Sequence, residues 1–260
     1  MNILEEIARN KSRKIIKRER NKNLISFSDA LLNKNKLGRL ALISEIKPRS
    51  PSQGNLRKVQ DPKILAKIMQ DNGAAAISIL TEENYFGGSI ENLIDVSNEI
   101  KLPLLRKDFI TSAEEIDEAY NCNADAILLI VALLKKNTGK LFEKCKEVRL
   151  DALVEVHNHE ELKIAIDIGA KIIGINNRDL TTLKINLKTT ENLIQPIPEN
   201  TIVISESGVK NKTDAEYLAS LGANAILVGS SLMQSSDVGN AIKELSEVML
   251  SKKKYRLNVS

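Results

Sequence analysis

The sequence predicts an α/β fold in which eight parallel strands close into a single (β/α)8 barrel, the TIM-barrel architecture, with an N-terminal helical extension. Short, nearly continuous apolar runs alternate with segments of 3.6-residue periodicity, as buried parallel strands joined by helices should. The chain of 260 residues also fits one such domain, because barrels commonly run to about 250 residues. The eight expected strands are 41–46, 76–80, 102–105, 126–131, 152–156, 172–175, 202–204 and 225–228.

Three regions follow from this pattern: an N-terminal helical arm at 1–40 packed on the barrel, the barrel at 41–250, and a basic tail at 251–260. Periodicity predicts two helices in the arm, at 2–20 and 27–34. Side chains with capping character precede several helices. They are Ser26 or Ser28 for the second arm helix, Asn158 with Glu161 in capping-box spacing, and Asn211 or Thr213.

Composition limits the classes of function. The formal net charge is +4, but basic residues concentrate at 1–22 and 252–260, which leaves the barrel mildly acidic. Such ends are typical of solvated helix faces, so we expect no nucleic-acid partner. No apolar stretch approaches the roughly 20 residues of a membrane span. No signal-peptide pattern is present, and two cysteines are too few for a disulfide framework, which predicts a cytoplasmic protein.

Two loops stand out because they follow strands and lack apolar periodicity. Residues 47–61 contain two prolines, a glycine and two serines, and residues 81–89 contain two glycines. Loops of this length within a compact barrel are usually functional. We therefore expect 47–61 to act as a lid that becomes ordered when ligand binds.

Glycine and serine follow the last two expected strands, at 205–208 and 229–231. Barrels often bind phosphate through these two loops, with backbone N–H groups and a helix N-terminus as donors. Glycine lets the backbone approach the anion, and serine adds a hydroxyl donor. The alternative is that these glycines only form tight turns.

A second group of residues is ionic. Glu45, Lys47, Lys107, Asp108 and Glu155 lie at the ends of the first, third and fifth expected strands, which should converge on one cavity. Lysines beside carboxylates can keep one acid and one base in working protonation states near neutral pH. The alternative is a structural ring of ion pairs that supports the barrel.

His157 and His159 have the spacing of a metal-binding pair, but no third ligand is evident nearby, so we expect no metal. Four apolar side chains at strand ends could form ordinary packing or a wall for a flat aromatic ligand. They are Phe86, Phe109, Leu128 and Leu180.

At these residues the chain resembles indole-3-glycerol phosphate synthase, the ring-closing enzyme of tryptophan biosynthesis. The most specific matching segments are PLLRKDFI at 103–110, GINNRDL at 174–180 and VISESGV at 203–209. Two departures lie in the first loop: Pro48 stands at a position expected to be basic or polar, and Gln53 replaces an expected lysine or arginine. The other matches are SEIKPRSPSQG (44–54), ISILTEENYFGGS (77–89), ADAILLIVALL (124–134), LVEV (153–156) and ILVGSSLM (226–233).

The resemblance implies ring closure of 1-(2-carboxyphenylamino)-1-deoxyribulose 5-phosphate with loss of carbon dioxide and water and without a cofactor. It implies Lys107 as general acid and Glu155 as the group that moves the proton during loss of water. The resemblance further implies that Lys47 meets the anionic groups of the substrate while Glu45 tunes its charge, and that Asn176, Ser207 and Glu206 orient the substrate hydroxyls. It implies carboxylate contacts at Arg178 and Ser50, and a phosphate site at Gly208, Gly229 and Ser230 with Lys47. The four apolar residues would form the pocket for the aromatic ring.

Two other interpretations stay open at this point. A phosphosugar isomerase would share the phosphate loops but favour a Cys and Asp acid–base pair, and neither Cys122 nor Cys145 lies at an expected strand end. A non-enzymatic phosphometabolite-binding barrel should have lost Lys107 or Glu155, and both are present. We expect a monomer and leave open an association with other tryptophan-pathway enzymes.

Overall fold

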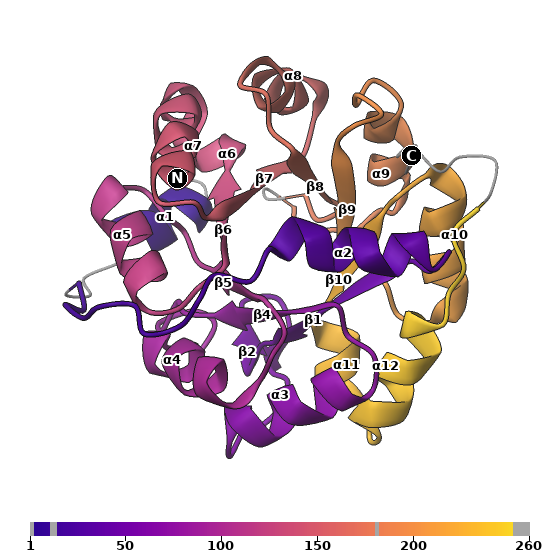
Figure 1. Ribbon diagram of the computed structural model, residues 1–260. Helices are drawn as coiled ribbons and strands as arrows, with labels where there is room; N and C mark the ends of the chain where they lie inside the picture. The colour runs from indigo at the N-terminus through magenta and orange to yellow at the C-terminus, as the bar shows by residue number, and fades with distance from the viewer. Residues whose placement is uncertain (1–2, 11–14, 180–181, 252–260) are drawn as a thin grey trace.

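The computed structural model of the chain describes residues 3–10, 15–179 and 182–251 and contains eight parallel strands closed into a barrel, as the sequence predicts (Figure 1). The barrel strands are β1 (Ala41–Ile46), β4 (Ala76–Leu80), β5 (Leu104–Lys107), β6 (Ala126–Ile130), β7 (Asp151–Val156), β8 (Ile172–Asn176), β9 (Ile202–Glu206) and β10 (Ala225–Val228). Each strand pairs with the next in this order, and β10 pairs with β1 to close the ring.

Helices surround the strand ring (Figure 1). They are α3 (Pro62–Asp71), α4 (Ile90–Glu99), α5 (Ala113–Asn121), α6 (Val131–Leu134), the 3-10 helix η1 (Lys135–Asn137), α7 (Thr138–Glu147), α8 (His159–Asp167), α9 (Lys188–Ile194), α10 (Lys212–Leu221), α11 (Ser230–Gln234) and α12 (Val238–Ser246). One apolar cluster fills the barrel interior and another lies between strands and helices. Both are mainly aliphatic, because only 3% of the chain is aromatic.

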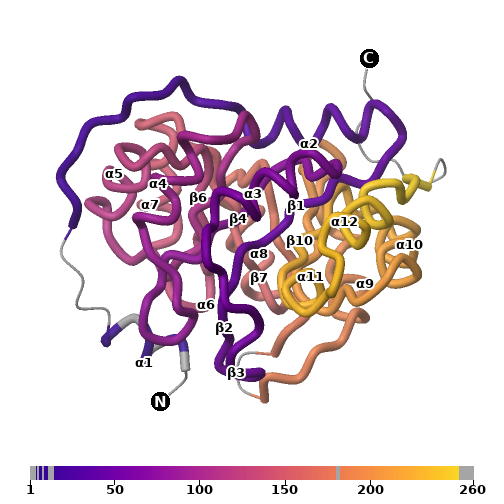
Figure 2. The backbone as a smooth tube through the Cα atoms, turned by 90° about the horizontal axis from the view of Figure 1, so that it is seen from below, coloured from indigo at the N-terminus to yellow at the C-terminus, as the bar shows by residue number. Residues whose placement is uncertain are grey.

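The N-terminal arm differs from the prediction. It contains α1 (Ile3–Arg9) and α2 (Phe27–Lys36), which lie at opposite ends of the barrel (Figure 2). The predicted helix at 2–20 is therefore too long: residues 15–26 are not helical, and 11–14 fall outside the described residues. Basic residues at helical spacing in this stretch repel one another, and an extended backbone can bind the barrel instead.

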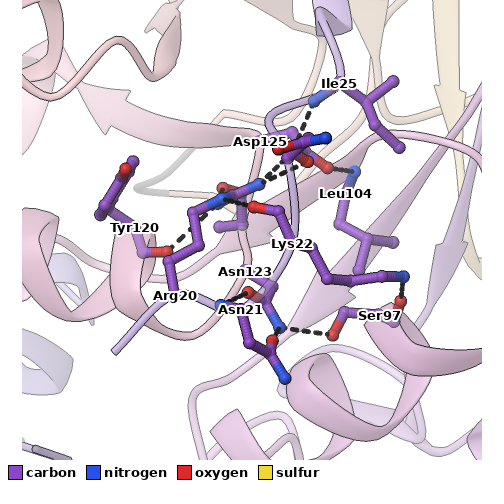
Figure 3. A network of polar contacts seen from close by, with 11 residues as sticks. Arg20, Asn21, Lys22, Ile25, Ser97, Leu104, Tyr120, Asn123 and Asp125 are labelled. Carbon is purple, nitrogen blue, oxygen red and sulfur yellow. Dashed lines mark hydrogen bonds and ion pairs between the residues drawn. The ribbon is translucent and has the colours of Figure 1, made fainter. Parts of the chain in front are cut away.

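This extended segment is held on the outside of the barrel (Figure 3). The Arg20 guanidinium donates to Asp125 Oδ1 at 2.7 Å and to the Ala124 carbonyl at 2.6 Å. Asp125 also accepts from the backbone N–H groups of Ile25, at 3.0 Å, and Leu104, at 3.0 Å. One buried carboxylate therefore joins the arm to the beginnings of β5 and β6.

Several boundaries move relative to the sequence prediction. β5 begins two residues later than expected, after Pro103, which has no backbone N–H to donate. β9 extends to Glu206, so that this side chain lies on a rigid strand rather than in a loop. The loop at 47–61, expected to be irregular, contains the hairpin strands β2 (Arg49–Ser50) and β3 (Gly54–Asn55).

The capping predictions are confirmed. Ser26, rather than Ser28, caps α2 by accepting from the Asp29 N–H at 3.0 Å, while Asn158 and Asn211 cap α8 and α10. Among the described residues, no helix has both the length and the apolar character that a membrane crossing requires.

The Arg20 anchor generates a stability prediction. We expect Arg20→Ala to lower the free energy of unfolding by about 3 kcal/mol, because it removes the cation from a buried pair and leaves Asp125 uncompensated. Urea unfolding measures the loss. Lys17→Ala, an exposed change in the same segment, is the matched control. Equal stability of the two variants would contradict the anchoring role.

Candidate active site

A cavity of about 470 Å³ opens at the carboxyl ends of the barrel strands, where barrel enzymes place their active sites. Every predicted site residue that the structure describes lines this cavity. They are Glu45, Lys47, Ser50, Phe86, Lys107, Phe109, Leu128, Glu155, Asn176, Arg178, Glu206, Ser207, Gly208, Gly229 and Ser230. Leu180, the remaining predicted contact, lies outside the described residues.

Four ionisable side chains from alternate barrel strands form one layer across the mouth. Glu45 comes from β1, Lys107 from β5, Glu155 from β7 and Glu206 from β9. Lys107 Nζ lies 3.8 Å from Glu155 Oε2 and 3.6 Å from Glu206 Oε2. Side chains from alternate strands fill barrel interiors in this layered way, so the fold itself brings the four groups together.

The layer separates the protonation states of its members. Burial opposes a charge on Lys107, but Glu206, Glu155 and Glu45 together outweigh it and raise the pKa of the ammonium. Burial, reinforced by Glu155, raises the pKa of Glu206 to about 8. Burial also disfavours ionised Glu155, but contacts with His157 and Lys107 lower the pKa of that carboxyl. Near neutral pH the cavity thus holds a cation, an ionised carboxylate and a carboxyl that retains its proton.

Glycines on the intervening strands make room for these carboxylates. A Cβ at Gly174, on β8, would lie 2.1 Å from Glu206 Oε1. A Cβ at Gly229, after β10, would lie 2.3 Å from Glu45 Oε1. Glu45 in turn pairs with Lys47, whose Nζ lies 2.8 Å from Glu45 Oε1. Lys47 is the second lysine that lines the cavity.

The hairpin after β1 lies against the end of β8. Arg178 Nη1 donates to Ser52 Oγ at 3.2 Å and to the Leu183 carbonyl at 3.0 Å, while the Arg178 N–H donates to Asn176 Oδ1 at 3.0 Å. Ser50 Oγ is buried in the cavity wall with no hydrogen-bond partner among the described residues. A guanidinium beside an unsatisfied hydroxyl suits a bound carboxylate.

One side of the cavity is apolar. The Phe86 and Phe109 rings lie 5.9 Å apart between centroids, and Leu128 is buried beside the opening. Leu4 and Ile7 of α1 also line the cavity, and the sequence analysis did not predict that contribution. Their spacing of three residues on a short amphipathic helix was a signal, but nothing in the sequence gave the position of that helix.

The turn after β9 has an unusual backbone conformation. Ser207 and Gly208 both have positive φ, +64° and +100°, and both line the cavity. Asn177 fixes this turn: its Nδ2 donates to Ser205 Oγ at 2.9 Å and to the Ser207 carbonyl at 3.0 Å. Sequence reasoning missed Asn177, because its side chain turns away from the cavity.

The cysteines and histidines do not form a competing centre. Cys122 and Cys145 are buried outside the cavity, which disfavours an isomerase with a Cys and Asp pair. Within the ranges that the structure covers, no three His, Cys, Asp or Glu side chains gather to hold a metal ion. His157 contacts Glu155 and Glu161 instead.

Fold and cavity together define a (β/α)8-barrel enzyme, and comparisons with known proteins give its family. The family model described as indole-3-glycerol phosphate synthase matches residues 2–245. The protein of that name from Methanocaldococcus jannaschii is 43% identical over 264 residues, covering 94% of this chain and 98% of the relative. That from Dehalococcoides mccartyi strain CBDB1 is 46% identical over 208 residues, covering 78% and 80%.

The chain therefore belongs to the indole-3-glycerol phosphate synthase family, and the resemblance seen in the sequence is confirmed. Solved structures agree on the fold alone. A tryptophan synthase from M. tuberculosis is similar with a TM-score of 0.61 and 13% identity, covering 90% of this chain and all of that one. A thiamine phosphate pyrophosphorylase from Pyrococcus furiosus has a TM-score of 0.61 and 18% identity, covering 83% and 96%.

The role of Gly174 can be tested directly. We expect Gly174→Ala to displace the Glu206 carboxylate from Lys107 and to cost about 1–3 kcal/mol of stability, because the new methyl would overlap Glu206 Oε1 and crowd Leu153. Urea unfolding and a crystal structure of the variant measure both effects. Gly139→Ala, where only Ile168 is near at 3.4 Å, is the control. A stable variant with Glu206 in its original place would refute the argument.

Proposed function

We propose that this chain converts 1-(2-carboxyphenylamino)-1-deoxyribulose 5-phosphate to indole-3-glycerol phosphate, with loss of carbon dioxide and water and with no cofactor. The observation that carries the proposal is the Lys107 ammonium held between Glu155 and Glu206 inside the cavity. Ring closure and dehydration need a proton donor and a proton acceptor in one pocket, and this layer supplies both.

The charged layer supplies the chemistry. Lys107 acts as the general acid at the substrate ketone, since its pKa is raised and it stays protonated. Glu155, which is ionised and lies on the other side of the substrate from the acid, takes up the proton during loss of water. Lys47 meets the anionic groups of the substrate, and Glu45 orients Lys47 through their 2.8 Å contact.

The rest of the cavity orients the substrate. Asn176 and Ser207, with Glu206 beside them, hold its hydroxyls, and Arg178 with Ser50 holds its carboxylate. The phosphate lies at Gly208, Gly229 and Ser230, where the turn after β9 and the backbone after β10 face the cavity. The apolar wall receives the aromatic ring and consists of Phe86, Phe109, Leu128 and Leu180. We further propose a cytoplasmic monomer, which light scattering would test for the oligomeric state.

The direct test is turnover of the substrate, followed by indole fluorescence, with one carbon dioxide released per product. We expect Lys107→Ala to lower the rate by about 10²- to 10⁴-fold, because the general acid is lost. Phosphate binding should persist, since the proposed phosphate site lies across the barrel mouth from Lys107. Lys163→Ala, an exposed lysine on α8, is the matched control. Near-normal turnover by Lys107→Ala would exclude this residue as the acid.

The phosphate placement makes a second prediction. Inorganic phosphate should compete with substrate and appear in crystals between Gly208 and Ser230. We expect Gly229→Ala to weaken this inhibition about tenfold, or about 1.4 kcal/mol, because the added methyl would overlap Glu45 Oε1 beside the proposed phosphate site. Inhibition constants measure the change. Unchanged inhibition, or phosphate bound away from β9 and β10, would overturn the placement.

The hairpin at β2 and β3 is proposed to open and close over the cavity. The Arg49 N–H donates to the Phe86 carbonyl at 3.2 Å, and Arg57 Nε donates to the Met233 carbonyl at 2.9 Å, so both ends are fixed while residues 51–55 are exposed. Hydrogen exchange across 48–58 with and without a substrate analogue tests this motion. Equal protection in both states would mean a preformed loop.

A further inference from the structure

His157 lies directly behind Glu155, outside the cavity that Glu155 lines. Its Nε2 is 3.3 Å from Glu155 Oε1, and its Nδ1 is 2.9 Å from Glu161 Oε2. The backbone N–H of His157 also donates to Glu161 Oε2, at 2.8 Å. The imidazole is therefore placed between two carboxylates, with its side chain only 10% exposed.

Glu161 is itself held in place. Its Oε1 accepts from Asn158 Nδ2 at 2.7 Å, and its backbone N–H donates to Asn158 Oδ1 at 2.9 Å. The N-terminal turn of α8 thus provides a fixed anchor for the imidazole. A rigid anchor matters, because a positioning contact transmits geometry only if its own rotamers are locked.

The two oxygens of Glu155 face different cations. Oε1 contacts His157, which directly follows β7, the strand of Glu155, and Oε2 faces Lys107 Nζ of β5 at 3.8 Å. The other charged groups that act on Glu155 and Lys107 are Glu206 of β9 and Glu45 of β1, both carboxylates. His157 is thus a cation that acts on Glu155 from outside the cavity.

We infer that His157, as an imidazolium anchored by Glu161, is the positioning residue that orients Glu155 and keeps it ionised for proton transfer. The inference rests on the proposed role of Glu155 as the proton acceptor. Burial disfavours an ionised Glu155, and the imidazolium offsets this from outside the cavity. The ion pair at 3.3 Å also favours the orientation in which Oε1 faces His157 rather than Lys107, the proposed acid.

The imidazolium state follows from the same geometry. Burial lowers the pKa of His157, but Glu155 and Glu161 outweigh it and raise the pKa to about 10. The charge is consequently present throughout the neutral range. An unperturbed imidazole would lose its charge near pH 6.5.

The first test uses nuclear magnetic resonance and needs no turnover. The chain has only two histidines, so His159→Gln leaves a single imidazole signal, that of His157. We expect this imidazole to stay protonated well above pH 7, and Glu161→Gln to bring its titration to lower pH. Titration of His157 near pH 6.5 in the parent background would overturn the inference.

The second test is kinetic. His157→Gln keeps an N–H donor but removes the charge. We expect kcat to fall about 10- to 100-fold with KM nearly unchanged, because Glu155 is misplaced while the cavity wall is intact. Loss of the imidazolium raises the pKa of Glu155, so the acid-side limb of the kcat/KM profile should move to higher pH.

His159→Gln is the matched control and should keep the parent profile, since His159 is exposed at the start of α8. A His157→Gln profile that coincides with the parent in an active enzyme overturns the positioning role alone. Failure of the parent itself to turn over the substrate overturns the proposed function, and with it the catalytic meaning of His157. The magnetic resonance titration does not depend on turnover and tests the charge of His157 in either case.

Discussion

The site depends on one largely buried ammonium, Lys107, placed among three carboxyl groups at the mouth of the barrel. Removing one partner of a buried ion pair leaves the charge of the other uncompensated, which costs several kcal/mol. The cluster is stable because each charge comes from a strand of a closed sheet and because neighbouring strands contribute glycine, at 174 and 229, where the carboxylates need space. The packing of the barrel therefore sets the electrostatics of the cavity.

This arrangement also explains how one layer can hold both an acid and a base. The three carboxylates share Lys107 unequally, since Glu155 has a second cation in His157 and Glu206 has no hydrogen-bond partner among the described residues. Glu155 is consequently ionised, whereas Glu206 keeps its proton near neutrality. Roles differ between chemically identical side chains because their surroundings differ.

The sequence predicts much of the fold, and it places the catalytic candidates correctly in one cavity. Strand ends converge in any barrel, so residues such as Lys107 and Glu155 could be grouped from the alternation of apolar runs alone. Other features depend on contacts between distant segments. Nothing local shows that the arm leaves the helix after Arg9 to bind Asp125, or that the Asn177 side chain turns away from the cavity to fix the turn at Ser207. The expected length of the first helix was wrong for the same reason, because tertiary contacts override helix propensity.

The central claim is that the charged layer meets the substrate with Lys107 at the ketone and the phosphate at the ends of β9 and β10. A crystal structure of the Glu155→Gln variant with bound 1-(2-carboxyphenylamino)-1-deoxyribulose 5-phosphate tests it most directly. The account predicts Lys107 Nζ within hydrogen-bond distance of the ketone oxygen, about 3 Å, and the phosphate on the backbone N–H groups of Gly208 and Ser230. A substrate bound in the opposite orientation, with its phosphate near Phe86 and its ketone away from Lys107, would contradict it.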